Sequence, residues 1–380
     1  MKNSRVHYLI RQPDAGRAFS TAVSLHSHTM HSKESMTFVE RLTRKSKWFS
    51  TFIDGQLRRY SESPEEASLA IEVRRMWWTS PLSASQAFKA ESQQIEESLG
   101  LNPIVSITDH DNIDAPLKLQ SFTDNGVAPI SVEWTTPYRE TYFHMGVHNL
   151  HPQWAREMMA RMEAFTAAPT EQQLSDMFHE LHAHPGVLIV LNHPYWDQPT
   201  IGNEAHEKLL RAFVEQFRDV IDALEINGLR SWKENRKVVR MANETGIPLI
   251  SGGDRHGREP NAVLNLTNAA TFGEFAEQLR SGAPSEVLVM PQFHDPLVVR
   301  ILHGLWDVLE DHPEHAEGRV RWSQRVYRRC WDDQVRPFEH FFPKGEPFLM
   351  RQLLRVARFT ASQKLRPAWQ KVTYGSDMAL

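Results

Sequence analysis

Short apolar segments typical of β-strands alternate along most of this chain with stretches whose apolar residues recur at helical spacing. The strand-like segments are 22–28 (AVSLHSH), 103–110 (PIVSITDH), 128–134 (APISVEW), 142–150 (YFHMGVHNL), 187–193 (VLIVLNH), 223–227 (ALEIN) and 248–254 (PLISGGD). Strand alternating with helix indicates βα units around a mainly parallel sheet or barrel. We therefore predict an α/β fold with these strands in its main body.

Two regions depart from this alternation. Residues 36–80 are too long for a plain crossover between the first two strands, and the Ser63-Pro64 pair inside them is typical of a helix start. Residues 291–380 predict helices without strands. We expect a main domain at 1–290, with 36–80 inserted as a lid over a pocket or as a surface decoration, and a helical C-terminal extension at 291–380.

The composition limits which partners and which cellular compartment can be expected for this protein. Of the 380 residues 41% are hydrophobic, enough for a sizeable core, and the net charge of -4 gives no whole-chain argument for nucleic acid. Cys330 is the one cysteine, so no internal disulfide can form. The N-terminus lacks the apolar core of a signal peptide, and no apolar run reaches the roughly 18 residues of a membrane span. We expect a cytoplasmic protein without a membrane partner.

The C-terminal region is locally basic. Residues 319–371 hold 13 Lys and Arg against 4 Asp and Glu, with aromatic residues interleaved. Segment 319–331 has the charge expected of a nucleic-acid site. The alternative, which we favour, is a segment that simply docks on the main domain.

Metal-binding side chains fall at or near the ends of the predicted strands. Residues two apart in a strand share a face, so His26 and His28 are expected to point the same way. The carboxyl ends of parallel strands form one active face. The residues expected to meet there are His26, His28, His110, Glu133, His144, His193, Asp254 and His256. Burying so many ionisable groups together without a cation is costly, which predicts a metal site.

The pieces SLHSH, ITDHD, SVEW, FHM, NHP and SGGDRH, in this order, resemble the PHP family, the polymerase and histidinol phosphatase superfamily. The match spans roughly residues 20–285. The resemblance implies a distorted seven-stranded (βα)7 barrel of PHP type that holds two or three divalent metal ions. Imidazole and carboxylate ligands suit Mn, Fe or Zn.

The same resemblance implies three metal positions. The first would use His26, His28 and Asp254 and share Glu133 with the second, which His144 and His193 complete; the third would use Glu34, His110 and His256. Two of these ligands have alternatives. His31 could replace Glu34, and His148 lies on the same strand face as His144.

This ligand set predicts a hydrolase that cleaves phosphate esters. The nucleophile would be a hydroxide that bridges metal ions, and the substrate a small phosphorylated metabolite or nucleotide. The alternatives are a phosphodiesterase acting on a cyclic or nucleotide diester, a metal-dependent hydrolase of the amidohydrolase kind, and an inactive PHP module that acts through its C-terminal helices.

Candidates beyond the metal ligands are few. Arg255 and His31 are weak catalytic candidates, and the substrate-binding candidates are Arg255, Arg230, Asn227 and Tyr195. Arg255 alternates with Asp254 and His256 along the chain. It therefore has a second interpretation, as a salt bridge in the wall of the barrel.

Overall fold

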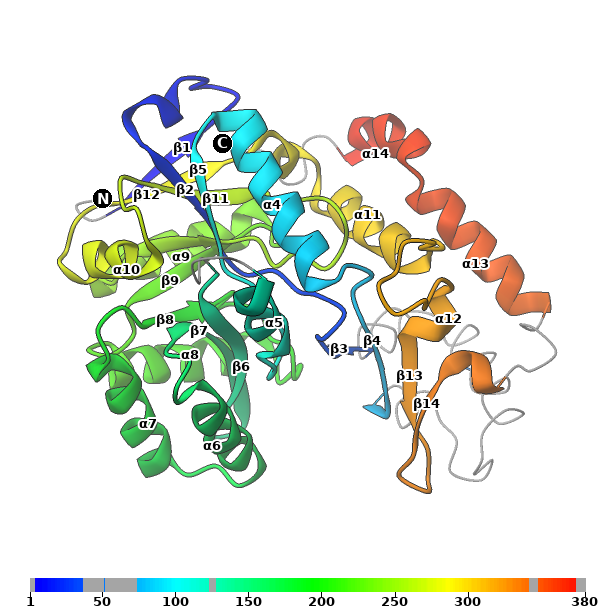
Figure 1. Ribbon diagram of the computed structural model, residues 1–380, viewed down its shortest axis with the longest axis horizontal. Coiled ribbons are helices and arrows are strands. Elements are labelled where there is room, and N and C mark those ends of the chain that lie inside the picture. Colours follow the sequence, from blue (N-terminus) through cyan, green and yellow to red (C-terminus); the bar gives the residue numbers. More distant parts are fainter. Residues whose placement is uncertain (1–3, 37–50, 52–73, 123–127, 342–347, 374–380) are drawn as a thin grey trace.

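Two five-stranded sheets form the centre of the protein, with helices around them (Figure 1). The computed structural model describes residues 4–36, 51, 74–122, 128–341 and 348–373. The first sheet has the order β1-β12-β11-β2-β5. Its strands are β1 (Ser4–Tyr8), β12 (Ser285–Val289), β11 (Val263–Thr267), β2 (Thr21–Ser24) and β5 (Asn102–Val105).

The second sheet has the order β10-β9-β8-β7-β6. Its strands are β10 (Leu249–Gly252), β9 (Ala223–Asn227), β8 (Leu188–Asn192), β7 (Thr141–Leu150) and β6 (Ile130–Tyr138). Strands β8, β9 and β10 are parallel, whereas β7 is antiparallel to both β6 and β8. The seven predicted strands are therefore β2 and β5 to β10. Strands β1, β11 and β12 were not expected from the sequence.

Single-residue bridges join the two sheets. Ser27 pairs with Arg255 beyond the ends of β2 and β10, and His110 pairs with Glu133 beyond β5. Neither sheet closes on itself by continuous pairing. What the structure shows is a mixed α/β fold in which two sheets meet where the predicted site residues lie.

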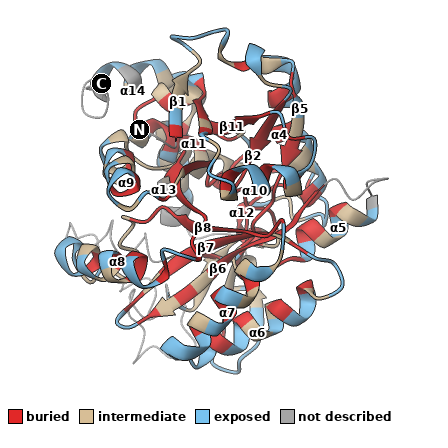
Figure 2. Ribbon diagram, turned by 90° about the vertical axis from the view of Figure 1, so that its left-hand side faces the viewer, coloured by how far each residue is buried: buried red, intermediate tan, exposed pale blue. Residues whose placement is uncertain are grey.

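Amphipathic helices bury the outer faces of the sheets, and most residues of the central strands are buried (Figure 2). The helices around the sheets are α4 (Ala84–Leu99), α5 (Asp114–Phe122), α6 (Ala155–Ala167), α7 (Glu171–Ala183), α8 (Asn203–Phe217), α9 (Trp232–Thr245) and α10 (Phe272–Arg280). Ser83 caps the start of helix α4, where its side chain and Gln86 form a reciprocal capping box. Within the described residues no helix is long and apolar enough to cross a membrane.

The C-terminal region is not purely helical, which corrects the prediction. Its helices are α11 (Leu297–Leu309), α12 (Trp322–Arg325), α13 (Phe348–Ala361) and α14 (Arg366–Thr373), with 3-10 turns at Pro291–His294, Phe338–Phe341 and Gln363–Leu365. Strand β14 (Val335–Pro337) pairs with β13 (Val326–Arg329), which pairs with β4 (Met76–Trp78), and β4 pairs in turn with β3 (Glu34–Ser35). The pairing of β13 with β4 could not be read from local patterns, because it joins Val326 to Trp78, far away in the chain.

Two further expectations concern the same region. Most of insertion 36–80, including the expected helix start at Ser63, lies outside the described residues. In segment 319–331, Arg325 and Arg328 are buried. Arg325 donates hydrogen bonds to the carbonyl oxygens of Val308 and Glu310, so its charge faces the protein interior.

Candidate metal centre

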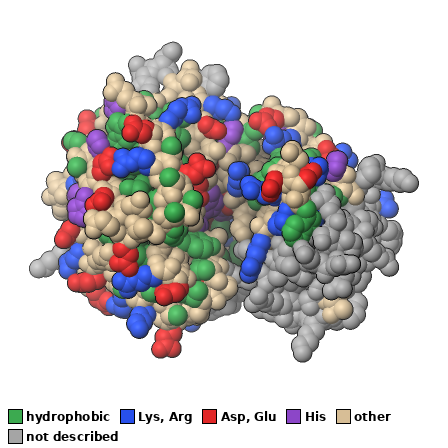
Figure 3. Space-filling model, turned by 90° about the horizontal axis from the view of Figure 1, so that it is seen from below, with side chains coloured by type: hydrophobic (Ala, Val, Ile, Leu, Met, Phe, Trp, Pro, Cys, Tyr) green, Lys and Arg blue, Asp and Glu red, His purple; other side chains and the backbone are tan. Residues whose placement is uncertain are grey.

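All nine predicted ligand side chains contact one another in one cluster, where the two sheets meet. Most of them are fully buried, and His110 and His256 are the most exposed, with side chains 16% and 17% accessible. In the space-filling view, histidine side chains lie at the bottom of a hollow in the surface (Figure 3). The residues come from β6, β7 and the loops after β2, β5, β8 and β10, and Glu34 is on β3.

Glu133 is the centre of the cluster. Its Oε2 lies 3.0, 3.3 and 3.2 Å from nitrogens of His26, His28 and His110. Its Oε1 lies 3.2 and 3.0 Å from nitrogens of His144 and His193. One carboxylate thus faces two separate groups of imidazoles, which is the arrangement of a carboxylate that bridges two cations.

Two more carboxylates complete the cluster. Oε1 of Glu34 lies 3.2 Å from His256 Nδ1, and its Oε2 lies 3.4 Å from His110 Nε2. Oδ1 of Asp254 lies 2.9 Å from His256 Nε2 and within 3.7 Å of His26 and His28. The combinations of at least three ligand atoms close enough to share one ion include His26 with His28 and Asp254, and His28 with Glu34 and His256.

Unusual backbone conformations aim three of these side chains. His26, His193 and Asp254 have φ angles of 63°, 26° and 55°. Such conformations are costly for residues other than glycine and concentrate at functional sites. Strand β2 ends at Ser24. His26 and His28 therefore converge because the chain turns after β2, and not because strand residues two apart share a face.

His144 takes the position for which His148 was an alternative. Because β7 is antiparallel to β6 and β8, its first half lies beside the carboxyl ends of those strands, and His144 pairs in register with Asn192. His148 lies deeper and contacts the Ser106 hydroxyl at 2.8 Å. The structure does not bring His31 into the cluster: its ring contacts Lys118 at 3.0 Å.

Two residues that the sequence analysis did not select hold the cluster in place. Oε1 of Glu225 lies 2.5 Å from His26 Nδ1, and its Oε2 accepts the backbone N–H of His193. Asn192 donates to Glu133. Gly252 leaves the room that Glu225 occupies, because a side chain at this glycine would clash with the carboxylate. A carboxylate inside the apolar strand ALEIN was the available signal.

Arg255 adopts the second of its two interpretations. Its guanidinium donates to Glu91 on α4 at 2.7 Å and to the carbonyl oxygen of Gly257 at 2.6 Å, and both side chains of the pair are buried. Glu91 also accepts hydrogen bonds from Ser24 and Asn261. Arg255 therefore fastens the chain between two ligands and does not reach the cluster.

The substrate-binding candidates lie at different depths. Arg230 donates to Asp254 at 3.3 Å, and its guanidinium lies 3.6 Å from the ring centre of Trp196. Asn227 donates to Glu225 and Asp254. Tyr195 lies under Lys237 on α9 and away from the cluster.

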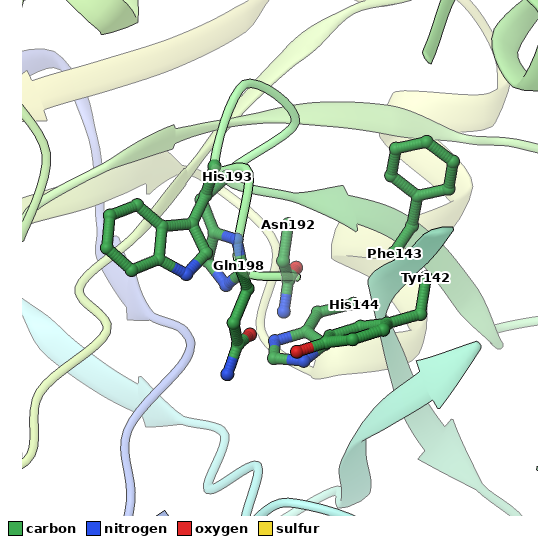
Figure 4. A pocket seen from close by; sticks show the side chains of 7 residues that line it. Tyr142, Phe143, His144, Asn192, His193 and Gln198 are labelled. Atoms are coloured by element: carbon green, nitrogen blue, oxygen red, sulfur yellow. The ribbon is translucent and has the colours of Figure 1, made fainter. Parts of the chain in front are cut away.

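A small pocket opens beside two of the ligands (Figure 4). Tyr142, His144, Asn192, His193 and Gln198 line it, together with Phe143 and Trp196. Two candidate ligands thus form part of a pocket wall. Tyr195 was predicted to bind substrate, but its neighbour Trp196 is the residue that lines this pocket.

The ligand side chains strongly shift one another's pKa values. Burial lowers the pKa of His110, but Glu133 and Glu34 outweigh it and raise the value to about 10. The pKa of His256 is raised to about 9, since Glu34 and Asp254 outweigh burial. Burial and the neighbouring His256 lower the pKa of His28 to about 3. Histidine in both charge states thus surrounds carboxylates whose pKa values lie well below their usual range.

The donor set fits divalent cations. Six buried ligand atoms of the cluster lie close to other ligand atoms but make no contact with the geometry of a hydrogen bond, and they are His26 Nε2, His28 Nε2, Glu34 Oε1, Glu133 Oε2, His144 Nδ1 and His256 Nδ1. Buried polar atoms are ordinarily satisfied, so six such atoms in one place indicate a missing common partner. Imidazole nitrogens and carboxylate oxygens are the ligands that Mn, Fe and Zn take.

Comparison with known proteins gives distant structural likenesses only. No family model and no curated protein matches the sequence. An amidohydrolase from Chromobacterium violaceum, with bound sulfate and no metal, is 13% identical, with a TM-score of 0.35 over 56% of this chain and 94% of its own. A protein from Bifidobacterium adolescentis, assigned as a metal-dependent phosphoesterase, is 14% identical, with a TM-score of 0.33 over 54% and 92%.

A third solved structure is a two-domain protein from Bacteroides vulgatus that contains a predicted PHP-like metal-dependent phosphoesterase. It is 11% identical, with a TM-score of 0.36 over 53% of this chain and 60% of its own. The likeness of the present chain to the PHP family rests on its ordered motifs and on the convergence of the side chains that they carry.

Proposed function

We propose that this protein is a metal-dependent hydrolase that cleaves phosphate ester bonds of a small phosphorylated metabolite or nucleotide. The observation that carries the proposal is the placement of five imidazoles around the two oxygens of Glu133. Divalent ions bound there would supply an activated water and neutralise charge on the phosphoryl group.

We assign the ion positions as the resemblance to the PHP family implies. His26, His28 and Asp254 would hold the first ion, and His144 and His193 the second, with Glu133 between them. Glu34, His110 and His256 would hold the third. Glu225 would keep the His26 ring oriented by accepting its Nδ1–H, as carboxylates commonly do for metal-bound histidines.

We also infer that the two sheets together make the distorted seven-stranded barrel. Strands β2 and β5 to β10 form a ring if the bridges Ser27–Arg255 and His110–Glu133 count as its two seams. Both seams are short, and backbone hydrogen bonds cross each of them, such as Gly253 N–H to the Leu25 carbonyl oxygen and Asp111 N–H to that of Glu133. Both seams contain ligand residues or their direct neighbours, so ions bound there would fasten them.

Arg230 is the residue best placed to meet a phosphate. Its side chain is 13% accessible, it lies against Asp254, and its Nε has no hydrogen-bond partner. A planar guanidinium suits bidentate phosphate recognition. Its role would be to orient substrate oxygens beside the ligand cluster.

The test is metal analysis of the purified protein together with a panel of phosphate monoesters, phosphate diesters and carboxamides. The proposal predicts three bound ions per chain and phosphate-ester hydrolysis that Mn²⁺ stimulates. His193→Ala should lose the second ion and most turnover, whereas His179→Ala, on the exposed surface of α7, should retain both. Turnover of carboxamides only, or ion binding without hydrolysis of any ester, would contradict it.

A further inference from the structure

Helix α11 carries a line of polar residues on the side that contacts the loops after β9 and β10. Arg300, His303 and Asp307 are three and four residues apart, so they lie on one face of the helix, and Glu310 follows at its end. Arg300 and His303 are buried although α11 belongs to the C-terminal extension. A buried polar line on an otherwise apolar helix needs partners, and the loops after β9 and β10 provide them.

Arg300 holds the loop after β9. Its guanidinium donates to the carbonyl oxygens of Gly228 and Arg230, the latter at 3.1 Å, and also to that of Asp295. It packs 4.4 Å from the ring centre of Phe293. The backbone of Arg230 is therefore fastened by α11, while its side chain reaches Asp254.

Asp307 holds the loop after β10. Its Oδ2 accepts the backbone N–H of Arg258 at 2.6 Å, two residues beyond His256. Arg258 also forms an ion pair with Glu310. Gly257 allows this approach, because a Cβ at that position would clash with Asp307. The sequence GDRHG thus ends in a glycine where the loop meets α11.

We propose that α11 is a clamp in which Asp307 positions His256 and Arg300 positions Arg230, so that the C-terminal extension is a working part of the site. This proposal rests on the proposed function, because it assigns ion binding to the loop after β10, which carries His256, and phosphate binding to the loop after β9, which carries Arg230. Neither Asp307 nor Arg300 touches the ligand cluster. Both act through backbone groups, and both are positioning residues.

The two contacts predict different losses. Removing the Asp307 carboxylate frees the loop that carries His256, so the third ion should bind at least about tenfold more weakly while the first two remain. Loosening Arg300 frees Arg230 and not a ligand. We therefore expect KM for a phosphate ester to rise about tenfold, with kcat and the ion count little changed.

The experiment counts bound Mn²⁺ in the full chain by equilibrium dialysis and mass spectrometry. Asp307→Ala should lose one ion per chain. Asp307→Asn, which retains an oxygen to accept the Arg258 N–H, should keep it. Asp311→Ala is the matched control. Asp311 is an acidic residue just beyond the end of the same helix, and its ion pair with Arg358 is long, at 3.8 Å. Loss of an ion in the control as well, or its retention in Asp307→Ala, would overturn the clamp.

Arg300→Lys tests the other contact, with Arg300→Met as the stronger change. Melting curves in chelator establish that each variant is folded. A rise in KM at constant ion count supports the clamp, and an unchanged KM in both variants refutes the role of Arg300. If the wild-type chain itself binds no ion, the proposed function fails. If it binds three and Asp307→Ala also binds three, only the clamp fails.

Discussion

The buried ion pair between Glu91 and Arg255 gives the sharpest test of how this site is held together. The two side chains are 0% and 3% accessible and their closest atoms are 2.7 Å apart. The pair joins α4 to the chain between two candidate ligands, Asp254 and His256. We consider Glu91→Gln, which keeps the shape of the side chain and removes its charge.

The expected loss of unfolding free energy is large because Arg255, the partner of Glu91, stays buried. Arg255 would retain only carbonyl acceptors, chiefly that of Gly257. Leaving one charge of a buried pair uncompensated typically costs about 3–5 kcal/mol, whereas replacing both partners by uncharged residues is often neutral. We therefore expect Glu91→Gln to lose about 3–5 kcal/mol of unfolding free energy and the double variant with Arg255→Met to recover most of it.

The assay is urea unfolding, followed by tryptophan fluorescence in chelator, so that metal binding does not contribute. Glu244→Gln is the matched control. It breaks the exposed pair with Arg211, at 3.1 Å and more than half accessible on both sides, and should cost less than about 1 kcal/mol. If Glu91→Gln costs no more than this control, or if the double variant is as unstable as the single one, the argument from burial is refuted.

Three further outcomes follow from the same geometry. The pKa values of His110 and His256 are raised to about 10 and about 9 by the carboxylates around them, so both rings are protonated at pH 8 and must lose their protons to bind metal. Although burial opposes the shift, the carboxylates around His26 also raise its pKa well above the usual value. Metal uptake at pH 8 should therefore release at least two protons per chain and should strengthen as pH rises from 7 to 10; equal calorimetric heats in buffers of different ionisation enthalpy would contradict this. Gly252→Ala should displace the Glu225 carboxylate and reduce the ion count in metal analysis, and a full complement would show that the loop adapts. His31→Ala should leave ion count and turnover unchanged, because that ring points away from the cluster; a lost ion would restore it as a ligand.

The site could be predicted from the sequence to the extent that it follows strand order. Side chains at the ends of parallel strands must meet at one edge, and this places His110, His193 and Asp254 without knowledge of loop geometry. The strands themselves were expected to end one to five residues too late where ligands follow them, since His26, His193 and Asp254 have positive φ angles beyond β2, β8 and β10.

What the sequence did not reveal depends on partners distant in the chain. In the sequence, Glu91 is one polar residue among several on an amphipathic helix. Its role as the partner of Arg255 becomes visible only when α4 is packed against the loop after β10. The pairing of β13 with β4 links residues about 250 positions apart. Local sequence patterns do not reveal contacts between distant residues. Helices were therefore predicted throughout 291–380, where the short strands β13 and β14 occur.

The four-stranded sheet of β3, β4, β13 and β14 has a consequence for any attempt to trim this chain. Cutting after residue 290, at the expected domain boundary, removes β13 and leaves β4 with a bare edge. Unpaired edges recruit strands from other molecules. The shortened product should therefore self-associate. Glu34 lies on β3, which pairs with β4, so it should also be held less firmly. The C-terminal extension and the two short strands that flank insertion 36–80 therefore depend on each other.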